Sequence, residues 1–440
     1  MLISFSVTNY RSIKDTATLS FLPVKAFKEL PGNVFKATDK INLLRSAVIY
    51  GANASGKSNV LKALEGFINY ITNSAKLQLE EDIPLYEPFR LNSSNLKKSS
   101  DFSLEFVDMD NTRWKYSIEI KSKVVEKESL FSYPKGQKTK HYIREIGKPI
   151  EFGTTIKGEK KSIEARLLKN QLFLTKGANE NISSLQLIYL DLISSFDFQT
   201  ELGDYLKIPM ASNIIARFYY DLNENTRMNL NKLVSSLDTG IIDFQIKNNQ
   251  QGHNLFSKED VRKVFTNEFK QNFINEFSYE INTIHNQYDD NKKIINQVSF
   301  NIDDESAGTR TILSVAMFIL SAVENNLIFI IDEIEQNLHP LIVNALVSLF
   351  NNPEINTKNA QLICTTHNTY LLSEDIFRRD QIWFTEKNER GETTLYSMAD
   401  IDGVRSNIPY DKWYLSGRFG ATPIINEPDF LYKKNGPKKK

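Results

Sequence analysis

Short segments that alternate polar and apolar residues open the chain. This alternation predicts strands that bury one face, and it occurs at Leu2–Val7, Thr16–Leu22, Phe102–Val107 and Trp114–Ile120. Between them, the apolar run Ala47–Tyr50 predicts a buried strand, and apolar residues at helical spacing follow from Asn59 to Ile71. We therefore expect residues 1–155 to form a mixed α/β lobe with an antiparallel part.

A second α/β pattern occupies residues 301–440. Helices are predicted at Ala307–Val323 and Pro340–Phe350, and strands at Leu327–Ile331, Gln361–Thr365 and Gln381–Thr385. Short apolar strands that alternate with helices are typical of a largely parallel sheet covered on both faces. The basic stretch Lys433–Lys440 is predicted to be a disordered tail, with contact to nucleic acid as the alternative.

The middle of the chain, residues 156–300, has a different character. It is polar and rich in asparagine, and its pattern is mainly helical, with the clearest helices predicted at Leu185–Ile193 and Phe265–Ile284. No heptad repeat is sustained here, so long coiled-coil arms are not expected. We predict a mainly helical domain inserted between the two α/β lobes.

Composition narrows the class of protein. Lysine plus arginine equals aspartate plus glutamate at 54 each in 440 residues. Net charge therefore does not indicate a polyanion binder, although a local basic face stays open. The single cysteine, Cys364, excludes a disulfide framework or a cysteine zinc site within one chain. The start of the chain does not read as a signal peptide, and apolar runs fall short of the roughly 20 residues of a membrane helix. We expect a soluble, cytoplasmic protein.

The strongest chemical signal is the motif G-x-x-x-x-G-K-S at residues 51–58, placed between a predicted strand and a predicted helix. In this context the motif predicts a phosphate-binding loop, where backbone N–H groups and a helix N-terminus surround the phosphates. Lys57 would reach the β- and γ-phosphates, and Ser58 would bind Mg²⁺. A plain glycine-rich turn is the weaker alternative. The predicted nucleotide-binding residues are Gly51, Asn53, Ala54, Ser55, Gly56, Lys57, Ser58 and Asn59.

Two further signals follow later strands. Asp332 and Glu333 end an apolar strand, where Asp332 would hold Mg²⁺ and Glu333 would act as the general base on water. Alone, they would equally fit an ordinary acidic turn; beside the loop motif, the site is favoured. His367 lies just beyond the next strand, where a γ-phosphate sensor would lie; a structural histidine is the alternative.

Together these residues resemble the ABC-type ATPases, particularly the SMC and RecF branch and its bacterial AAA-family relatives. Residues 8–13, T-N-Y-R-S-I, resemble the element that begins such heads, and residues 335–340 fall where the family has its D-loop. Ser306 and Gly308 occupy the place of the family signature, which caps the γ-phosphate of a second protomer. The signature reads S-A-G instead of S-G-G, and Gln171 is only a weak candidate for the Q-loop glutamine.

The resemblance implies the fold and the assembly: an α/β P-loop NTPase head of the ABC type, with a mixed sheet and helices on both faces. It implies ATP and Mg²⁺ as cofactors, Asp332 as the metal aspartate, Glu333 and His367 as catalytic residues, and a homodimer or a higher homo-oligomer closed around ATP.

Residues 414–421, Y-L-S-G-R-F-G-A, resemble the C-terminal element of bacterial anti-phage and abortive-infection ATPases of the AbiL, RloA and PARIS type. A structural turn is an equal reading of this segment. The favoured function is an ATPase that regulates a nearby-encoded effector, a nuclease or TOPRIM-like protein. The alternatives are a RecF-like DNA-binding ATPase, so that nucleic acid stays a candidate partner, and a scaffold that holds ATP with slow turnover. No membrane partner is expected.

Overall fold

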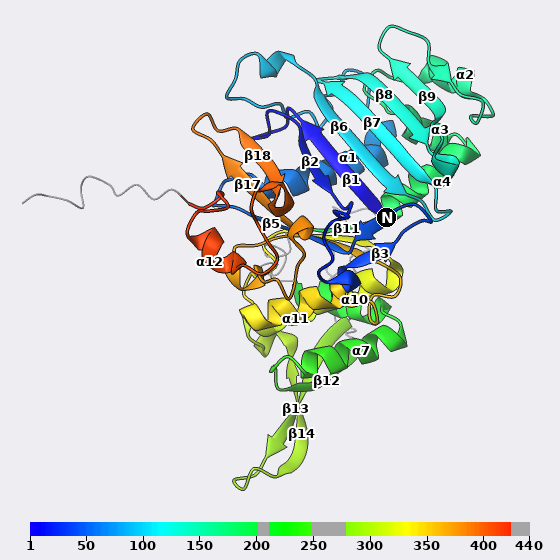
Figure 1. Ribbon diagram of the computed structural model, residues 1–440. Helices are drawn as coiled ribbons and strands as arrows, with labels where there is room; N and C mark the ends of the chain where they lie inside the picture. The colour runs from blue at the N-terminus through cyan, green and yellow to red at the C-terminus, as the bar shows by residue number, and fades with distance from the viewer. Residues whose placement is uncertain (201–210, 249–278, 424–440) are drawn as a thin grey trace, which may run out of the picture.

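The frame of the molecule is a pair of large sheets (Figure 1). The computed structural model describes residues 1–200, 211–248 and 279–423. The predicted tail at residues 433–440 therefore lies outside the described residues. Within the described part, the α/β class predicted from the sequence is confirmed.

The first sheet is antiparallel throughout and has the strand order β10-β9-β8-β7-β6-β1-β2. Its strands are β1 (Leu2–Thr8), β2 (Ala17–Ser20), β6 (Ser100–Val107), β7 (Arg113–Lys121), β8 (Val124–Ser132), β9 (Thr139–Glu145) and β10 (Glu151–Phe152). Every second residue of β7 is buried, as a sheet with one covered face requires. The four strands predicted by alternation are thus confirmed as β1, β2, β6 and β7.

The second sheet has the order β11-β15-β16-β5-β17-β18, and all neighbours are parallel except β17 and β18. Its strands are β11 (Phe196–Gln199), β15 (Ile328–Ile331), β16 (Gln361–Thr365), β5 (Ser46–Tyr50), β17 (Ile382–Lys387) and β18 (Thr393–Ser397). Strands β5, β15 and β16 are buried at every residue, because both faces are covered. Parallel strands bring their carboxyl ends to one edge, where ligands bind in such sheets.

Two hydrophobic cores lie on opposite faces of this second sheet. Ile49 and Ile330 belong to the core shared with the antiparallel sheet and with α1 (Lys57–Asn73), α3 (Phe173–Asn179) and α4 (Ser183–Ser194). Tyr50 and Ile331 belong to the other core, which includes α6 (Ala211–Asp221), α7 (Glu224–Ser235), α10 (Ala307–Asn325) and α11 (Pro340–Asn351). The fold is therefore layered as sheet, helices, sheet and helices, with α1 between the sheets.

Helix α10 is long and apolar enough to cross a membrane by length and composition. It is the central helix of the second core, since Leu313, Ala316 and Met317 are fully buried. Its apolar composition is explained by this packing.

Where the structure describes it, the middle segment contains more helix than strand, but it is not made of helices alone. Besides α2 (Lys160–Arg166), α3, α4, α6 and α7, it contains β11 and a three-stranded antiparallel sheet of β12 (Ile241–Asn248), β13 (Tyr279–Tyr288) and β14 (Ile294–Asn301). The helix predicted at Leu185–Ile193 is confirmed as α4. The helix predicted at Phe265–Ile284 is wrong over residues 279–284, and residues 265–278 lie outside the described part. Pairing of β13 with strands on both sides overrides the local helical pattern.

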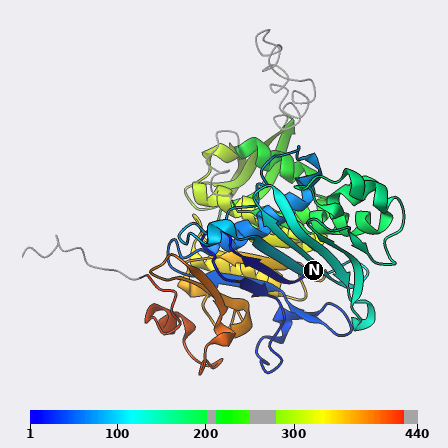
Figure 2. The same cartoon turned by 90° about the horizontal axis from the view of Figure 1, so that it is seen from above.

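The hairpin formed by β13 and β14 projects from the body of the molecule (Figure 1). Seen from above, helices α2–α4 lie on one side of the body and the β13–β14 segment on another (Figure 2). The fold also contains a two-stranded ribbon, formed by β3 (Val34–Lys36) and β4 (Asn42–Leu44). Helix α12 (Tyr410–Leu415) lies near the C-terminal end of the described residues.

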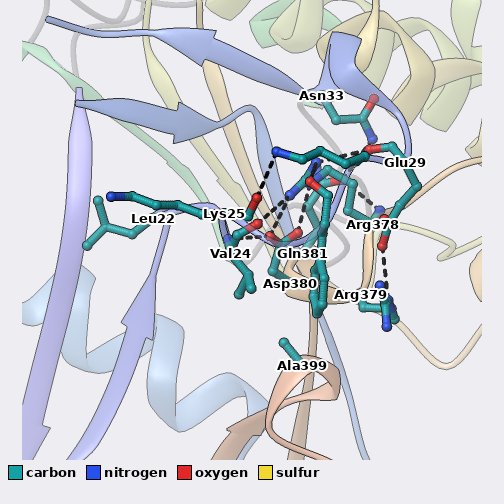
Figure 3. Close-up of polar contacts among 12 residues, drawn as sticks. Leu22, Val24, Lys25, Glu29, Asn33, Arg378, Arg379, Asp380, Gln381 and Ala399 are labelled. Carbon is teal, nitrogen blue, oxygen red and sulfur yellow. Dashed lines mark hydrogen bonds and ion pairs between the residues drawn. The ribbon is translucent and has the colours of Figure 1, made fainter. Parts of the chain in front are cut away.

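A buried polar cluster fastens residues 22–33 to the start of β17 (Figure 3). Arg378 and Asp380 form a two-point ion pair with distances of 2.9 and 2.8 Å, and both side chains are less than 5% exposed. Asp380 also accepts the backbone N–H of Val24 at 2.7 Å, and Arg378 donates to the carbonyl of Glu29 at 3.0 Å. Because these residues precede β17, the cluster lies at the opposite edge of the sheet from the phosphate-binding loop.

Removing one partner of this pair is expected to destabilise the fold without affecting the nucleotide site. Asp380→Ala leaves the Arg378 charge buried and unpaired, which costs about 3–5 kcal/mol. The measurement is the urea or thermal unfolding transition. The control is Lys36→Ala, which breaks the exposed pair with Asp39 and should change stability by about 0–1 kcal/mol. Equal effects of the two substitutions would contradict the prediction.

Candidate nucleotide site

The glycine-rich loop connects β5 to α1 at the carboxyl edge of the parallel sheet. Asn53 and Ala54 are exposed at its tip, whereas Gly56 is buried. Gly56 has a φ of 113°, and an added Cβ would lie 2.4 Å from Oγ1 of Thr393, so only glycine fits. The hydroxyls of Ser55 and Thr385 lie 2.6 Å apart. The β17–β18 hairpin thus supports the loop from below.

The N-terminal element also supports the loop. Oγ of Ser12 accepts hydrogen bonds from Nδ2 of Asn59 at 2.7 Å and from Oγ1 of Thr393 at 2.8 Å. Arg11 makes a two-point ion pair with Glu87. The side-chain amide of Asn59 therefore braces the first turn of α1, and its predicted contact with nucleotide stays a prediction.

Lys57 is the central cation of the site and is 6% exposed. Its Nζ donates to the carbonyls of Gly51 at 2.9 Å and Ala52 at 3.3 Å, and it lies 3.0 Å from Nε2 of His367. Burial lowers the pKa of Lys57, and the nearby carboxylates, Asp332 first among them, oppose that shift. Two residues 310 positions apart, both predicted from the sequence, thus meet at one point.

One hydroxyl contacts both acidic residues that follow β15. Oγ1 of Thr365 donates to Oδ1 of Asp332 and accepts the backbone N–H of Glu333 at 2.8 Å. Glu333 has a left-handed φ of 50° and is exposed, so its side chain is directed out of the strand end. Sequence reasoning missed Thr365, whose only signal is its place at the end of β16.

His367 completes the group. A protonated lysine has no acceptor, so Nε2 of His367 accepts the hydrogen bond from Lys57 and the ring proton lies on Nδ1. Burial lowers the pKa of His367, and the charge of Lys57 lowers it further. The imidazole next to Lys57 is therefore neutral. Its predicted contact with a γ-phosphate stays a prediction.

The signature residues lie at the start of helix α10. Ser306 caps α10, since its Oγ accepts the backbone N–H of Thr309 at 3.0 Å. A Cβ at Gly308 would lie 3.2 Å from the carbonyl of Asn337, so glycine allows the D-loop region to approach the helix. Within the described ranges, neither Ser306 nor Gly308 forms a hydrogen bond with the phosphate-binding loop.

The projecting hairpin is connected to the signature. Oε1 of Glu305, the residue before Ser306, accepts from Oγ1 of Thr283 at 2.5 Å and lies 2.8 Å from Nε2 of His285. Both partners belong to β13. The hairpin therefore contacts the residue that directly precedes the N-cap of α10.

The residues present fit a Mg²⁺ site completed by phosphate. Oγ of Ser58 and Oδ2 of Asp332 make no side-chain hydrogen bond to any residue that the structure describes, which leaves two hard oxygen ligands available. Across the same residues, no group of three or more His, Cys, Asp or Glu side chains could hold a metal ion. The two available oxygens suit Mg²⁺, which is usually held by one or two protein oxygens together with phosphate and water.

Gln171, the weak candidate for the Q-loop glutamine, is held by backbone carbonyls. Nε2 of Gln171 donates to the carbonyls of Ala75 and Leu77 at 3.1 and 3.0 Å, and the residue is buried. Gln171 therefore has a structural role, and the prediction that it is the Q-loop glutamine is wrong. Gln199 ends β11 and pairs with Ile331, the residue before Asp332. Strand β11 has only four residues, so the sequence alternation did not reveal this position.

The C-terminal element is a packed turn. Tyr414 contacts the rings of Tyr50 and Phe384, and Phe419 packs on Phe384. Gly417 and Gly420 both have positive φ. The structure therefore favours the reading of this segment as a support for β5 and β17.

Comparisons with known proteins give one family match and two distant structural likenesses. The family described as "AAA domain, putative AbiEii toxin, Type IV TA system" matches residues 46–373. No curated protein matches the chain. Among solved structures, the SMC head domain from Thermotoga maritima is 13% identical and covers 90% of this chain and 98% of its own, with a TM-score of 0.40. The recombination mediator protein RecF of the RecFOR pathway is 14% identical with the same coverages and a TM-score of 0.29.

Proposed function

Because this chain belongs to the family described as "AAA domain, putative AbiEii toxin, Type IV TA system" and is an ATPase, we propose that it hydrolyses ATP between two copies of itself and thereby regulates a partner effector in bacterial anti-phage defence. The observation that carries the proposal is the meeting of Lys57 and His367 beside Asp332 and Glu333 at one sheet edge.

Each side chain has a distinct part in the proposed reaction. Lys57 and the loop N–H groups bind the phosphates. Ser58 and Asp332 would hold Mg²⁺, which neutralises charge on the transferred phosphoryl group. Glu333 takes the proton of the attacking water. Thr365 holds the carboxylate of Asp332 and the backbone of Glu333. Gln199, next to Asp332 at the sheet edge, is proposed to help orient that water.

The proposed dimer is supported by the position of the signature at a helix N-terminus. Ser306 and Gly308 begin α10 and make no hydrogen bond to the loop of their own chain among the described residues, and a helix N-terminus favours an anion. A second copy would place its phosphate against them. The D-loop region, whose Asn337 carbonyl lies 3.2 Å from where a Cβ on Gly308 would stand, would then lie at the dimer contact.

A large cation at the signature is expected to block this dimer. Ser306→Arg, made in a Glu333→Gln background, should bind ATP normally and stay monomeric, because the side chain fills the phosphate-capping position. Loss of the helix cap costs only about 1 kcal/mol. Sedimentation with and without ATP gives the readout. The matched control is Ser194→Arg at the exposed end of α4, which should still dimerise; a dimer formed by Ser306→Arg would contradict the trans arrangement.

The proposed defence role is tested by identifying the molecules that bind to the protein. A tagged wild type and Glu333→Gln, expressed with the neighbouring genes, are purified and their partners identified by mass spectrometry. Retention of a nuclease or TOPRIM-like protein supports the proposal. Nuclease-sensitive DNA with no protein partner would replace it with the RecF-like alternative, whose binding should weaken steeply with salt. A slow basal rate that Glu333→Gln does not lower would favour the ATP-bound scaffold.

A further inference from the structure

Glu335 contacts the backbone of His367, the predicted γ-phosphate sensor, which is called the switch histidine below. The motifs in the sequence assign Glu335 no separate role. The chain turns at Glu333, and the N–H of Ile334 then donates to the carbonyl of Thr365 at 3.1 Å. This hydrogen bond holds the loop after β15 beside the loop after β16. It places Oε1 of Glu335 2.5 Å from the backbone N of His367, whose N–H it accepts.

The other oxygen of this carboxylate is unpartnered. Oε2 of Glu335 is buried and has no hydrogen-bond partner among the described residues. The same holds for Nδ2 of Asn368, which follows His367 in the chain. An unsatisfied buried polar atom costs about 1–3 kcal/mol and more when it is charged. Such a cost within an otherwise hydrogen-bonded site calls for an explanation.

The charge of Glu335 acts on both neighbouring cations. Among the carboxylates that favour the protonated form of His367, Glu335 has the largest effect, ahead of Glu333 and Asp332. It also acts on Lys57. In the structure, Lys57 occupies Nε2 of His367 as a donor, so the imidazole faces the site as an acceptor. An acceptor cannot bind a phosphate oxygen.

We propose that Glu335 is the positioning residue of the switch histidine: it fixes the His367 backbone and stabilises a ring proton at Nε2 once ATP draws Lys57 away. This inference rests on the proposed ATP site. With Lys57 on the phosphates, Nε2 loses its donor and can take a proton to donate to the γ-phosphate. Oε2 then balances that charge, and Asn368 is free to pair with it as the loop adjusts.

The test separates charge from hydrogen bonding. Glu335→Gln keeps an acceptor for the His367 N–H but removes the charge. It should lower kcat about 10- to 100-fold while the melting temperature and the Kd for ATP stay near wild type. Glu335→Ala, which removes both, should also lower the melting temperature. The matched control, Glu354→Gln, removes an exposed carboxylate after α11 and should change neither quantity.

A double-mutant cycle decides whether Glu335 acts through His367. In a His367→Ala background, Glu335→Gln should lower kcat no further, because both changes remove the same contribution. An additive loss, or a wild-type kcat for Glu335→Gln alone, would overturn the proposal. Failure of the ATP site itself would be recognised separately, as ATP binding by Lys57→Ala equal to wild type.

Discussion

Glu333→Gln is expected to lower kcat for ATP hydrolysis by about 10²–10⁴-fold, the range contributed by a positioned general base. Glutamine has nearly the same shape, so the loop geometry set by Thr365 is kept, but it cannot take a proton from water. ATP affinity should change little. The measurement is single-turnover phosphate release alongside equilibrium binding of a fluorescent ATP analogue.

The same variant should accumulate an ATP-bound dimer, because ATP hydrolysis no longer allows the closed dimer to open. Glu354→Gln again serves as the control and should turn over like the wild type. Hydrolysis by Glu333→Gln at the wild-type rate would show that the base lies elsewhere, with Glu335 the next residue to examine.

Lys57→Ala is expected to remove ATP binding at working concentrations. The substitution deletes the buried cation that contacts Gly51, Ala52 and His367. Loss of one partner in a buried, hydrogen-bonded charge pair costs about 2–5 kcal/mol, which corresponds to about 30- to 5,000-fold in Kd. Isothermal titration with ATP and Mg²⁺ measures the loss.

The control for this change is Lys76→Ala, which removes an exposed lysine just after α1 and should leave the Kd for ATP unchanged. The fold of Lys57→Ala should remain intact, because removing a poorly solvated charge does not open the core. An unchanged Kd in this variant would contradict the assignment of the phosphate-binding loop.

Much of the frame was readable because its signals are local. The run before Gly51 and the run before Asp332 are each a complete buried strand, and each ends in the residues that carry the chemistry. Helix α1 and helix α10 show their apolar faces within single segments. The predicted residues Lys57 and His367 were found separately, and the parallel sheet explains why they meet.

The missed features depend on partners far away in the chain. Thr365 matters only because β15 lies beside β16, and Thr393 only because β18 returns beneath the loop. Strand β13 looked helical because its pairing with β12 and β14 is invisible in its own sequence. Gln199 belongs to a strand of four residues, too short for periodicity to be read.

The place of β5 has a consequence for biosynthesis. This strand carries the phosphate-binding loop, yet both of its neighbours, β16 and β17, are made more than 300 residues later. Synthesis at about 5–20 residues per second leaves β5 exposed on the ribosome for tens of seconds, while the antiparallel sheet of β6 to β9 can form from adjacent hairpins. We therefore expect nascent chains that end before residue 387 to fold locally but to bind no nucleotide. ATP would then bind only to chains whose parallel sheet is complete.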